Sequence, residues 1–554
     1  MGFELRKTYP PVEHPSSQTD NYTYQSYALQ IANGEYDYDK GFYYQPFYYS
    51  VFLPLTYKAF GPGTHGVILV QSLLGAASVF LIGLAFAALF GRRTGIFAAV
   101  FLALCRFHIF YTPFTLIAVL QSFWISLIVL LVIWAYRRKN WWLWSIAALV
   151  LGLANVTRGN IILLAPLAIA LLIWQQRRQH RKLVLNLVLC AICWYLPQLP
   201  FAIVNYRATG AWVGPSTAGA NVLALGNTPE SPPGGREPYD AGAMAYPESC
   251  GAWVAADKAD GDSRVSIHRS MLNWFRREPL AYVELKARMF ILFWNRMEVP
   301  NNISILTRGQ PIPGRLIHLP FLLDFWLLGS LGVAGLLFAL IRSRRSPSVL
   351  LAVGCTLVYS LSIVLFYVLA RFRVPILPLV CGFAAYTVML LWRQRKELLR
   401  PRRPLLIHGG ILVASILFVV IGYDAYRFGW ESTVMRVARP NGVQVELPGK
   451  RLIKDHGPFQ FGGWVPEPGS SEIDKYFAGV PGLEKATRIE LRLAVNTTRP
   501  ARVILESMGV RKEYSPKPGL DWLAIDLPRE QVVVNSQGDQ VHLPLRITVT
   551  DPEA

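Results

Sequence analysis

The sequence predicts an α-helical polytopic membrane protein with about ten transmembrane helices and a C-terminal extracytoplasmic all-β domain. Three observations predict this class. Hydrophobic residues make up 53% of the 554 residues and the mean hydropathy is +0.31, which is too apolar for a soluble protein. Lys and Arg outnumber Asp and Glu by 55 to 35, and residues 430–554 alternate polar and apolar side chains. The composition excludes a disordered chain and a soluble nucleic-acid-binding protein.

Ten apolar stretches approach the length of roughly 20 residues that a helix needs to cross a bilayer. A long polar loop separates the first six stretches from the last four, so the predicted membrane regions are 64–204 and 316–423. We expect the individual spans at about 64–90, 94–112, 114–136, 141–157, 160–175, 184–204, 316–341, 349–369, 374–392 and 405–423. The fourth and fifth are short enough to form one broken hairpin.

Basic clusters follow every second span and set the predicted orientation. They lie at 92–93, 137–139, 177–182, 342–345 and 393–403. Because cytoplasmic loops carry the surplus of Lys and Arg, all five are predicted to be cytoplasmic. By parity, the extracytoplasmic parts are the first loop 1–63, the large loop 205–315 and the C-terminal tail. Residues 1–46 lack the apolar stretch of a secretory signal peptide.

The large loop and the tail carry different patterns. Residues 263–298 have the apolar periodicity and interspersed arginines of an amphipathic helix in the membrane interface. Period-two alternation at 488–495 and in three later runs predicts a small antiparallel sandwich over 430–554. We hypothesise that this β domain binds glycan or acceptor, which a glycan-binding measurement tests. Only Cys250 of the six cysteines lies outside an apolar run, so no disulfide framework is predicted.

Asp20 is the candidate catalytic residue. A carboxylate beside a membrane-apposed helix can act as a general base, because partial desolvation raises its basicity. The alternative is that Asp20 caps the helix that follows it. Tyrosines surround Asp20, and Tyr24 is as compatible with a sugar-binding platform as with an interfacial aromatic belt. Glu298, at the end of the large loop, is a second candidate carboxylate, with a solvated loop acid as the alternative.

Three arginines are candidates for binding a lipid-linked phosphate. Arg371 and Arg373 lie between two predicted spans, at the outer end of each, and Arg158 lies in another outer turn. A guanidinium near hydrocarbon is costly and usually partnered, and it grips phosphate oxygens in bidentate fashion. The alternative is that these side chains snorkel to lipid headgroups. The sequence contains no Gly-rich phosphate loop and no His, Cys and carboxylate cluster with metal-ligand spacing.

Taken in order, these segments resemble the GT-C superfamily of polyprenyl-phosphate-sugar-dependent glycosyltransferases. The resemblance is to the branch of bacterial protein mannosyltransferases and lipid A aminoarabinose transferases, and it runs from about residue 18 to 400. The motifs that carry it are the Asp20 loop, the aromatic stretch around Pro46, Val70 to Gly75, Gly152 to Asn160, Asn205-Tyr206, Gly219 to Asn227, and Arg371 to Pro378.

The resemblance implies an inverting glycosyltransferase that works at the outer face of the bacterial inner membrane. The donor would be a polyprenyl-phosphate-linked sugar, and the acceptor an envelope protein, lipid or glycan. Asp20 would deprotonate the acceptor, and Arg371 would hold the donor phosphate. Arginine can stabilise that phosphate without a metal, although some branches use one. The resemblance therefore implies no fixed cofactor and leaves a divalent metal as the alternative. Membrane lipid is an expected partner and nucleic acid is not.

The sequence also departs from the pattern of the superfamily. Asn21 stands where protein mannosyltransferases have a second acid, Gln45 where aminoarabinose transferases have lysine, and Gln121 where an acid is often found. Gln45 joins Tyr24 and Glu298 as a candidate substrate-binding residue. The helix that precedes the catalytic Asp in the superfamily has no counterpart in the sequence, so we expect either that it is missing from this chain or that the N-terminal segment translocates without it.

Other functions share parts of this pattern. The first is a transporter or flippase of a lipid-linked substrate, although such proteins tend to show internal repeats and broken helices in mid-membrane. The second is an enzyme similar to O-antigen ligases or polymerases. The third is an envelope-assembly protein that keeps the fold without catalysis. The charges at the outer ends of the spans and the large outer loop favour the glycosyltransferase.

Overall fold

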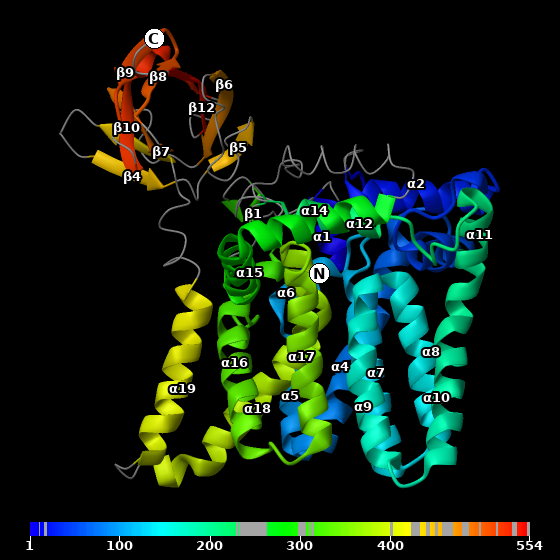
Figure 1. The fold of residues 1–554 in the computed structure, drawn as a ribbon. Helices are drawn as coiled ribbons and strands as arrows, with labels where there is room; N and C mark the ends of the chain where they lie inside the picture. The colour runs from blue at the N-terminus through cyan, green and yellow to red at the C-terminus, as the bar shows by residue number, and fades with distance from the viewer. Residues whose placement is uncertain are drawn as a thin grey trace. The chain divides into compact units, whose positions relative to one another are not determined.

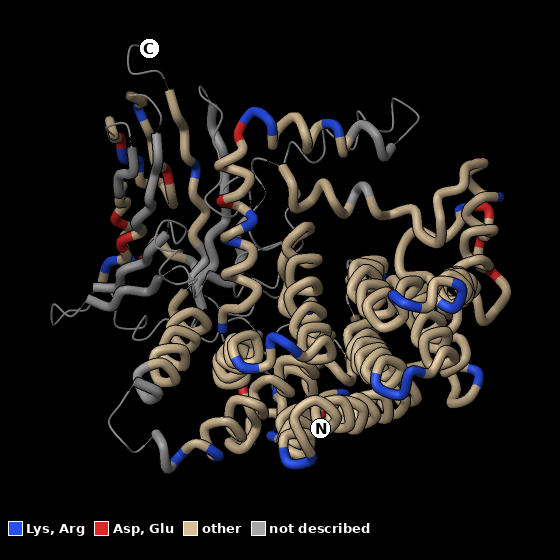
Figure 2. The backbone as a smooth tube through the Cα atoms, turned by 60° about the horizontal axis from the view of Figure 1, so that its bottom comes forward, with Lys and Arg blue, Asp and Glu red and all other residues tan. Residues whose placement is uncertain are grey.

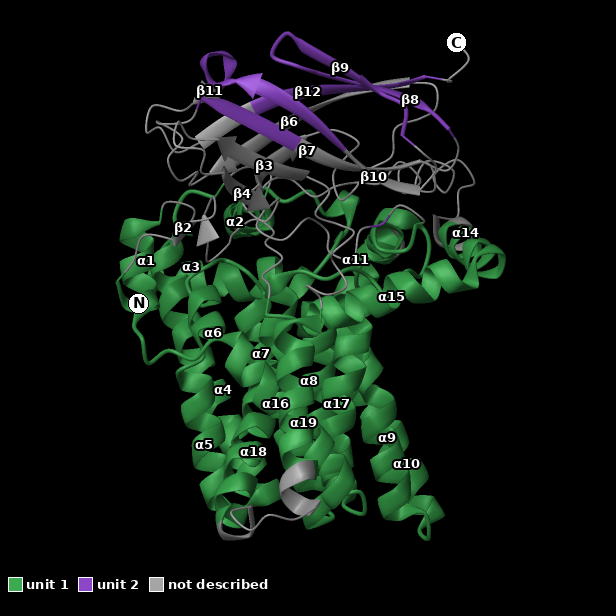
Figure 3. Ribbon diagram, turned by 90° about the vertical axis from the view of Figure 1, so that its left-hand side faces the viewer, with its two compact units in different colours: residues 1–229, 249–296, 313–422 green, residues 230–248, 297–312, 423–554 purple. Residues whose placement is uncertain are grey.

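The protein is mostly helical in its N-terminal three quarters and all-β in its C-terminal region (Figure 1). The computed structural model describes residues 1–9, 12–15, 19–228, 231, 263–296, 306–307, 310–311, 315–398, 403–422 and most of the C-terminal strands between 433 and 550. The chain divides into two compact units (Figure 3). The first comprises Met1–Pro229, Ser249–Arg296 and Pro313–Gly422, and the second comprises Glu230–Glu248, Met297–Ile312 and Tyr423–Ala554.

The first unit contains the membrane helices and the helices that connect them. Its α-helices are α1 (Gly2–Thr8), α2 (Asp20–Asn33), α3 (Leu53–Phe60), α4 (Thr64–Phe90), α5 (Arg92–Ala103), α6 (Arg106–Tyr111), α7 (Ala118–Arg138), α8 (Trp141–Thr157), α9 (Ala165–Gln176), α10 (His180–Tyr195), α11 (Leu199–Thr209), α12 (Gly219–Leu225), α14 (Ser263–Arg277), α15 (Pro279–Trp294), α16 (Phe325–Arg342), α17 (Pro347–Val364), α18 (Leu377–Leu398) and α19 (Arg403–Val420). Short 3-10 helices extend several of them, among them η4 (Gly159–Leu164), η5 (Leu196–Gln198) and η7 (Ala370–Ile376).

The described residues include seven helices that are long and apolar enough to cross a membrane. They are Thr64–Phe90, Ala118–Arg138, Gly159–Gln176, His180–Thr209, Phe325–Arg342, Pro347–Val364 and Ala370–Arg395. Two of the remaining predicted spans are shorter apolar helices, Trp141–Thr157 and Ile407–Val420. The predicted multispan class is therefore confirmed, and the predicted number of about ten exceeds the seven full-length spans among these residues.

The predicted span 94–112 is wrong as a single helix. It breaks between α5 and α6, where Cys105 adopts an extended backbone. The freed backbone groups are satisfied by Leu323, whose N–H donates to Leu104 O at 2.8 Å and whose carbonyl accepts from Arg106 N at 3.0 Å. Backbone polar groups at membrane depth need such partners, so this short bridge stabilises the break.

Small residues allow the membrane helices to pack closely. A Cβ added at Gly335 of α16 would lie 2.1 Å from the carbonyl oxygen of Phe383 in α18, and one added at Gly382 would meet the ring of Phe86 in α4. Such close backbone approach at small residues is typical of helix association in membranes. Phe90 stacks on Tyr386 with ring centroids 4.1 Å apart, so α4 and α18 also share an aromatic contact.

The basic loops gather at one end of the helix bundle (Figure 2). The Arg93 guanidinium lies 5.3 Å from the centre of the Trp392 ring. Arg342 donates to Gln394 Oε1 at 3.2 Å and lies 2.9 Å from His408 Nε2. Three of the predicted cytoplasmic clusters, which are far apart in sequence, are therefore neighbours in the fold.

The predicted amphipathic helix 263–298 is two helices, α14 and α15. The chain turns at Glu278, and Pro279 occupies the first turn of α15. Proline is well tolerated there because the first N–H groups of a helix have no partner within it. Trp274 of α14 and Tyr282 of α15 pack edge to face across this turn with centroids 5.3 Å apart, which fixes the angle between the two helices.

The second unit contains the predicted β domain. Its strands include β3 (Thr433–Ala438), β4 (Gln444–Pro448), β5 (Leu452–His456), β6 (Gly469–Ala478), β7 (Arg488–Thr497), β8 (Arg502–Ser507), β9 (Val510–Tyr514), β10 (Gly519–Pro528), β11 (Val533–Val534) and β12 (Gln540–Thr550). One antiparallel sheet has the order β10-β7-β3-β4, and the other has the order β5-β6-β12-β8-β9 with β11 beside β12. Alternate residues such as Ile489, Leu491, Val503 and Leu505 are fully buried, so the predicted period-two pattern is confirmed. The unit also contains β1 (Leu306–Thr307) and β2 (Gln310–Pro311), which form a two-stranded sheet.

Candidate functional site

Asp20 is the first residue of α2. The N-cap of this helix is Thr19, which has extended backbone and makes no side-chain capping hydrogen bond. The helix ends at Gly34, whose positive φ of 76° suits glycine at a helix C-terminus. In the structure Asp20 is therefore not the N-cap of α2. Its carboxylate contacts side chains from other segments of the chain.

The partner of Asp20 is Arg371. Arg371 Nη2 forms an ion pair with Asp20 Oδ2 and joins segments that are 351 residues apart in the chain. Arg371 lies in η7, just before α18 begins. The side chains of Asp20 and Arg371 are only 29% and 12% exposed, so water screens this pair less than a surface pair. Arg371 Nε is buried and has no hydrogen-bond partner among the described residues, so it is a donor open to a ligand.

Tyr44 is the second group on the Asp20 carboxylate, and the sequence analysis did not single it out. Its hydroxyl donates to Asp20 Oδ1 across 3.4 Å. Burial, and then the neighbouring Asp20 charge, raise the pKa of Tyr44 well above its ordinary value. Tyr44 therefore keeps its proton at physiological pH and acts as a donor to the carboxylate. Its place in a run of tyrosines gave no signal that set it apart.

Tyr24 and Gln45 bind each other. The Tyr24 hydroxyl donates to Gln45 Oε1, and the Tyr24 side chain is only 2% exposed. Gln45 has a positive φ of 51°, which is uncommon for a residue other than glycine, and it precedes Pro46. Neither an exposed sugar platform nor an interfacial belt describes Tyr24. The Tyr24 ring contacts the Tyr44 ring with centroids 5.7 Å apart, so the pair supports the segment that carries Tyr44.

Arg158 lies beside Arg371 because both contact Phe372. The Arg158 guanidinium lies 3.9 Å from the centre of that ring, and the Arg371 guanidinium lies 5.2 Å from it. The segment is fixed by Tyr359, whose hydroxyl donates to Phe372 O at 3.1 Å. Asn160, two residues after Arg158, donates to Ser362 Oγ at 2.7 Å. Two of the three predicted arginines therefore come together near Asp20.

Arg373 points elsewhere. It is fully buried, its Nη2 donates to Leu292 O at 2.6 Å, and its guanidinium lies 5.0 Å from the centre of the Phe325 ring. Residues two apart on a 3-10 helix of three residues per turn point in different directions, so Arg371 and Arg373 do not share a face. The structure does not bring Arg373 to Asp20. It supports instead a role in attaching the end of α15 to η7.

Two positions where the sequence departs from the superfamily pattern are buried. Asn21 is 1% exposed and Gln121 is fully buried. Asn21 Oδ1 and both amide atoms of Gln121 have no hydrogen-bond partner among the described residues. Glu298, the remaining candidate, lies outside the described residues. Within the described part of the chain, no three His, Cys, Asp or Glu side chains gather to hold a metal ion, and the metal requirement stays a prediction.

Asn205 of α11 and the loop after this helix hold the segment that precedes Tyr44 in place. Asn205 is fully buried, accepts a hydrogen bond from Phe42 N at 2.6 Å and donates to Gly214 O at 2.9 Å. Ser216 Oγ donates to Tyr43 O at 2.6 Å. These bonds fix the backbone on both sides of Tyr43 and so position Tyr44. Asn205 belongs to one of the motifs in which the sequence resembles the superfamily. Its two hydrogen bonds give a structural reason for an asparagine at this position.

A second junction connects the large loop to the end of α17, a few residues before η7. Asn227 Nδ2 donates to Leu365 O at 2.7 Å, and Lys286 Nζ donates to Gly226 O at 2.8 Å. Tyr282 of α15 donates its hydroxyl to Asn227 Oδ1 at 3.1 Å. The end of α12, the end of α17 and α15 therefore meet a few residues before Arg371. Sequence reasoning missed Lys286 because a single lysine on an amphipathic helix is unremarkable in a sequence.

Part of the chain is similar to a known protein family. Residues 44–201 match the family described as dolichyl-phosphate-mannose-protein mannosyltransferase. No curated protein matches the chain. The oligosaccharyltransferase AglB of Archaeoglobus fulgidus, solved with an inhibitory peptide and a dolichol-phosphate, is 15% identical with a TM-score of 0.40. That similarity covers 73% of this chain and 51% of AglB, so the chain spans about half the length of AglB.

ArnT of Cupriavidus metallidurans is also similar. Its apo structure is 16% identical with a TM-score of 0.31, and the similarity covers 78% of this chain and 90% of ArnT. Its structure with undecaprenyl phosphate is 13% identical, with a TM-score of 0.30 and the same coverage. The family match covers residues 44–201, which is less than half of the chain, and it agrees with the predicted resemblance. The class that the fold defines is a multispan membrane protein.

Proposed function

We propose that this protein is an inverting glycosyltransferase that moves a sugar from a polyprenyl-phosphate-linked donor to an envelope acceptor at the outer face of the membrane. The observation that carries the proposal is the contact between Asp20 and Arg371. A candidate base and a candidate phosphate ligand, 351 residues apart, meet at one end of the helix bundle. The match of residues 44–201 to a family named for a dolichyl-phosphate-mannose donor supports the donor class.

The proposed reaction is a single displacement. The acceptor hydroxyl gives its proton to Asp20, and its oxygen forms a bond to the anomeric carbon from the face opposite the phosphate. The bond between the anomeric carbon and the phosphate oxygen breaks, and its electron pair leaves with the polyprenyl phosphate. Arg371 and Arg158 stabilise the charge that develops on this phosphate, and the unpartnered Arg371 Nε is a donor available to it. The donated hydrogen bond of Tyr44 fixes the Asp20 carboxylate.

The test is transfer of radiolabelled sugar from polyprenyl-phosphate hexoses to total envelope acceptors in proteoliposomes. We compare the wild type with Asp20→Asn and with Glu35→Gln, which changes an exposed acid at the other end of α2. Because a positioned general base contributes about a hundredfold or more, D20N should lose at least that factor in transfer at unchanged donor binding. E35Q should keep wild-type transfer. Parallel reactions with and without chelator show whether a divalent metal is required.

The other outcomes separate the rival functions. Equal transfer by D20N and wild type would leave an enzyme whose base lies elsewhere, with Glu298 next to be tested. No transfer with any donor, accompanied by movement of the lipid-linked sugar across the bilayer, would support the transporter. Transfer only from lipid-diphosphate donors would support an enzyme similar to O-antigen ligases or polymerases. Neither transfer nor movement would favour the inactive assembly protein.

A further inference from the structure

The junction between α14 and α15 carries large apolar side chains that the described parts of the chain leave uncovered. We call residues 268–283, which span this junction, the elbow. Leu280 is 84% exposed and Val283 is 56% exposed, and Leu272 and Phe275 of α14 are exposed as well. Exposed apolar side chains that gather in this way mark a surface for a membrane or for another molecule.

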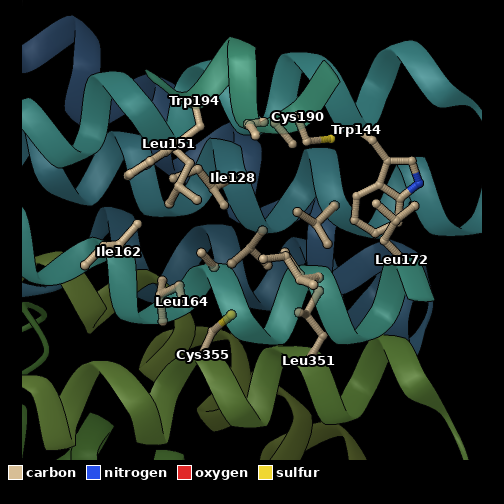
Figure 4. A pocket seen from close by; sticks show the side chains of 18 of the residues that line it. Ile128, Trp144, Leu151, Ile162, Leu164, Leu172, Cys190, Trp194, Leu351 and Cys355 are labelled. Carbon is tan, nitrogen blue, oxygen red and sulfur yellow. The ribbon is translucent and has the colours of Figure 1, made fainter. Parts of the chain in front are cut away.

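A second apolar feature of the first unit lies inside the bundle. It is a cavity of about 250 Å³ among α7, α8, η4, α9, α10 and α17 (Figure 4). The described residues that line it include Trp194, whose indole N–H is buried without a partner among them, and no charged side chain. This lining does not identify one class of ligand. The elbow differs from the cavity because charged side chains lie beside its apolar ones.

The charges of the elbow are mainly positive. Arg269, Arg276 and Arg277 are exposed, and Glu278 is the one acid within residues 268–283. Glu284, the next acid along the chain, already forms an ion pair within α15. The exposed arginines therefore give the elbow a net positive charge that attracts an acidic ligand.

The arginines and the buried side of α14 lie on different faces of the helix. Ile267 and Trp274 are buried and are seven residues apart, so they share one face. Arg269 and Arg276 follow these two residues by two positions each, which turns them by about 200° around the helix axis. Phe275 lies on the flank between the two faces. A helix with an apolar flank beside a basic face is typical of one that lies at a membrane surface.

The elbow is also placed where it can meet a membrane surface. Figure 1 shows α14 lying across the end of the bundle that carries α2. Figure 3 shows α15 crossing this end, with its junction to α14 extending beyond the helices below. Because lipid surrounds the sides of the bundle, a segment that overhangs its end lies over the surface of the adjacent leaflet. The apolar side chains then meet the acyl chains, and the arginines meet the headgroups.

We propose that the elbow binds acidic phospholipid in the leaflet at the Asp20 end of the bundle. Its apolar side chains enter the acyl layer, and its three exposed arginines form charge-assisted hydrogen bonds with lipid phosphates. Each basic residue near an acidic membrane surface contributes about fivefold to binding, the equivalent of about 1 kcal/mol. Three of them therefore favour an acidic headgroup over a zwitterionic one. This surface does not depend on the proposed function.

The elbow is connected to the candidate site through Tyr282. Phe275 packs on the Tyr282 ring with centroids 5.4 Å apart. The Tyr282 hydroxyl donates to Asn227 Oδ1 at 3.1 Å, and Asn227 Nδ2 donates to Leu365 O at 2.7 Å. Leu365 is six residues before Arg371. Binding of the elbow to lipid thus fixes the segment that leads to Arg371, and, where the proposed function holds, sugar transfer should rise with acidic lipid.

A fluorophore at position 280 tests the surface without relying on transfer. Leu280→Cys is labelled with NBD in the full-length protein without its natural cysteines, in nanodiscs of phosphatidylcholine with increasing phosphatidylglycerol. We expect the emission to shift to the blue as phosphatidylglycerol rises, and spin-labelled lipid to quench it. Arg276→Gln combined with Arg277→Gln should need at least about five times as much phosphatidylglycerol for the same shift. The matched control R178Q with R181Q removes two exposed arginines at the other end of the bundle and should titrate like the wild type.

Native mass spectrometry gives a second measurement on the protein with its natural cysteines, in case the cysteine-free protein does not fold. After release from mixed nanodiscs, the wild type should retain more phosphatidylglycerol than R276Q with R277Q. Added salt should reduce the retention by the wild type, because ions screen the attraction between arginine and phosphate. Equal retention by the two proteins would overturn the proposal.

The remaining outcomes separate the lipid surface from its rivals and from the function. An equal blue shift in phosphatidylcholine alone would show burial without selection of acidic lipid and overturn the proposal. A blue-shifted emission that spin-labelled lipid does not quench would show that protein covers the elbow, which also overturns it. A phosphatidylglycerol-dependent shift without transfer by the wild type would reject the proposed function and keep the surface. Transfer that is independent of phosphatidylglycerol would reject the connection through Tyr282.

Discussion

Tyr44 holds one oxygen of the Asp20 carboxylate while Arg371 holds the other. Removing the Tyr44 hydroxyl leaves the ion pair but frees the carboxylate to rotate. Because the hydrogen bond is long, at 3.4 Å, we expect Tyr44→Phe to lower kcat only about fivefold, equivalent to about 1 kcal/mol, with the donor KM unchanged. The adjacent Tyr43 is exposed and gives a matched control, so Y43F should transfer sugar like the wild type. A Y44F enzyme at full rate would show that Tyr44 does not position the base.

Lys286 makes the stability of the protein depend on pH. Burial lowers its pKa from 10.5 to about 7, and its amine donates to Gly226 O. Between about pH 7 and 10.5 the unfolded chain therefore binds a proton that the folded chain lacks. The free energy of unfolding rises with pH in this window, by at most about 1.4 kcal/mol per unit, and Lys286 adds no slope below it.

Unfolding in detergent between pH 6 and 10 tests this dependence. The difference between the wild type and Lys286→Met should rise with pH above about 7 and level off below it. The control Lys58→Met removes an exposed lysine and should leave the rise in place. A difference that stays flat, or that falls with pH, would contradict a buried Lys286 that loses its proton.

At the scale of single residues, the sequence indicated candidate residues for the site but not how they are arranged. Asp20 and Arg371 were both expected at the outer ends of helices, but a one-dimensional pattern does not state that they touch. Arg373 had the same residue type and almost the same position as Arg371. Their directions differ because η7 is helical, since residues two apart share a face on a strand but not on a helix, and the residue between them does not indicate which of the two forms. Tyr44 could not be distinguished from its neighbours because its role depends on the loop backbone.

Among the helices, the end of α12 depends on a glycine for its contact with the chain after α17. A Cβ at Gly226 would lie 1.4 Å from Phe366 O, so the backbone would have to move. We expect Gly226→Ala to lower the free energy of unfolding by about 3 kcal/mol or to prevent folding. It should also reduce transfer, because Phe366 is five residues before Arg371. Gly219 in the same helix has nothing within 4 Å of its Cβ position, so G219A is the control for unfolding in detergent. Equal stability of the two variants would contradict the tight junction.

Helix boundaries were predictable where composition changes abruptly. The spans at 64–90 and 141–157 coincide with α4 and α8. Gly63 and Gly91 cap α4, and Asn140 and Arg158 cap α8, so polar residues or glycine flank both helices. The break at Cys105 was not predictable, since neither proline nor glycine marks it. It exists because Leu323, 218 residues away, supplies the hydrogen bonds that the helix gives up. Such long-range compensation leaves no local trace in the sequence.

The described residues of the first unit separate their charges along the helix bundle. Arg371 precedes α18 and Arg395 lies near its end, so most of a helix of 22 residues, about 33 Å long, separates them. Arg138 and Arg158 are similarly separated by α8. The Asp20 group therefore lies at the opposite end from the clustered basic loops. If those loops are cytoplasmic, as the positive-inside rule predicts, the proposed reaction takes place outside.

Cysteine labelling of intact cells tests this orientation. In a background without the natural cysteines, Glu35→Cys places a thiol near the Asp20 end, and Arg178→Cys places one in a basic loop. Both positions are exposed. A membrane-impermeant maleimide should label position 35 in intact cells and position 178 only after permeabilisation, because the charge asymmetry orients the chain. The reverse labelling would put Asp20 on the cytoplasmic side and contradict transfer at the outer face. Transfer activity of both cysteine variants confirms that the labelled molecules are folded, so either pattern reports the orientation of the functional protein.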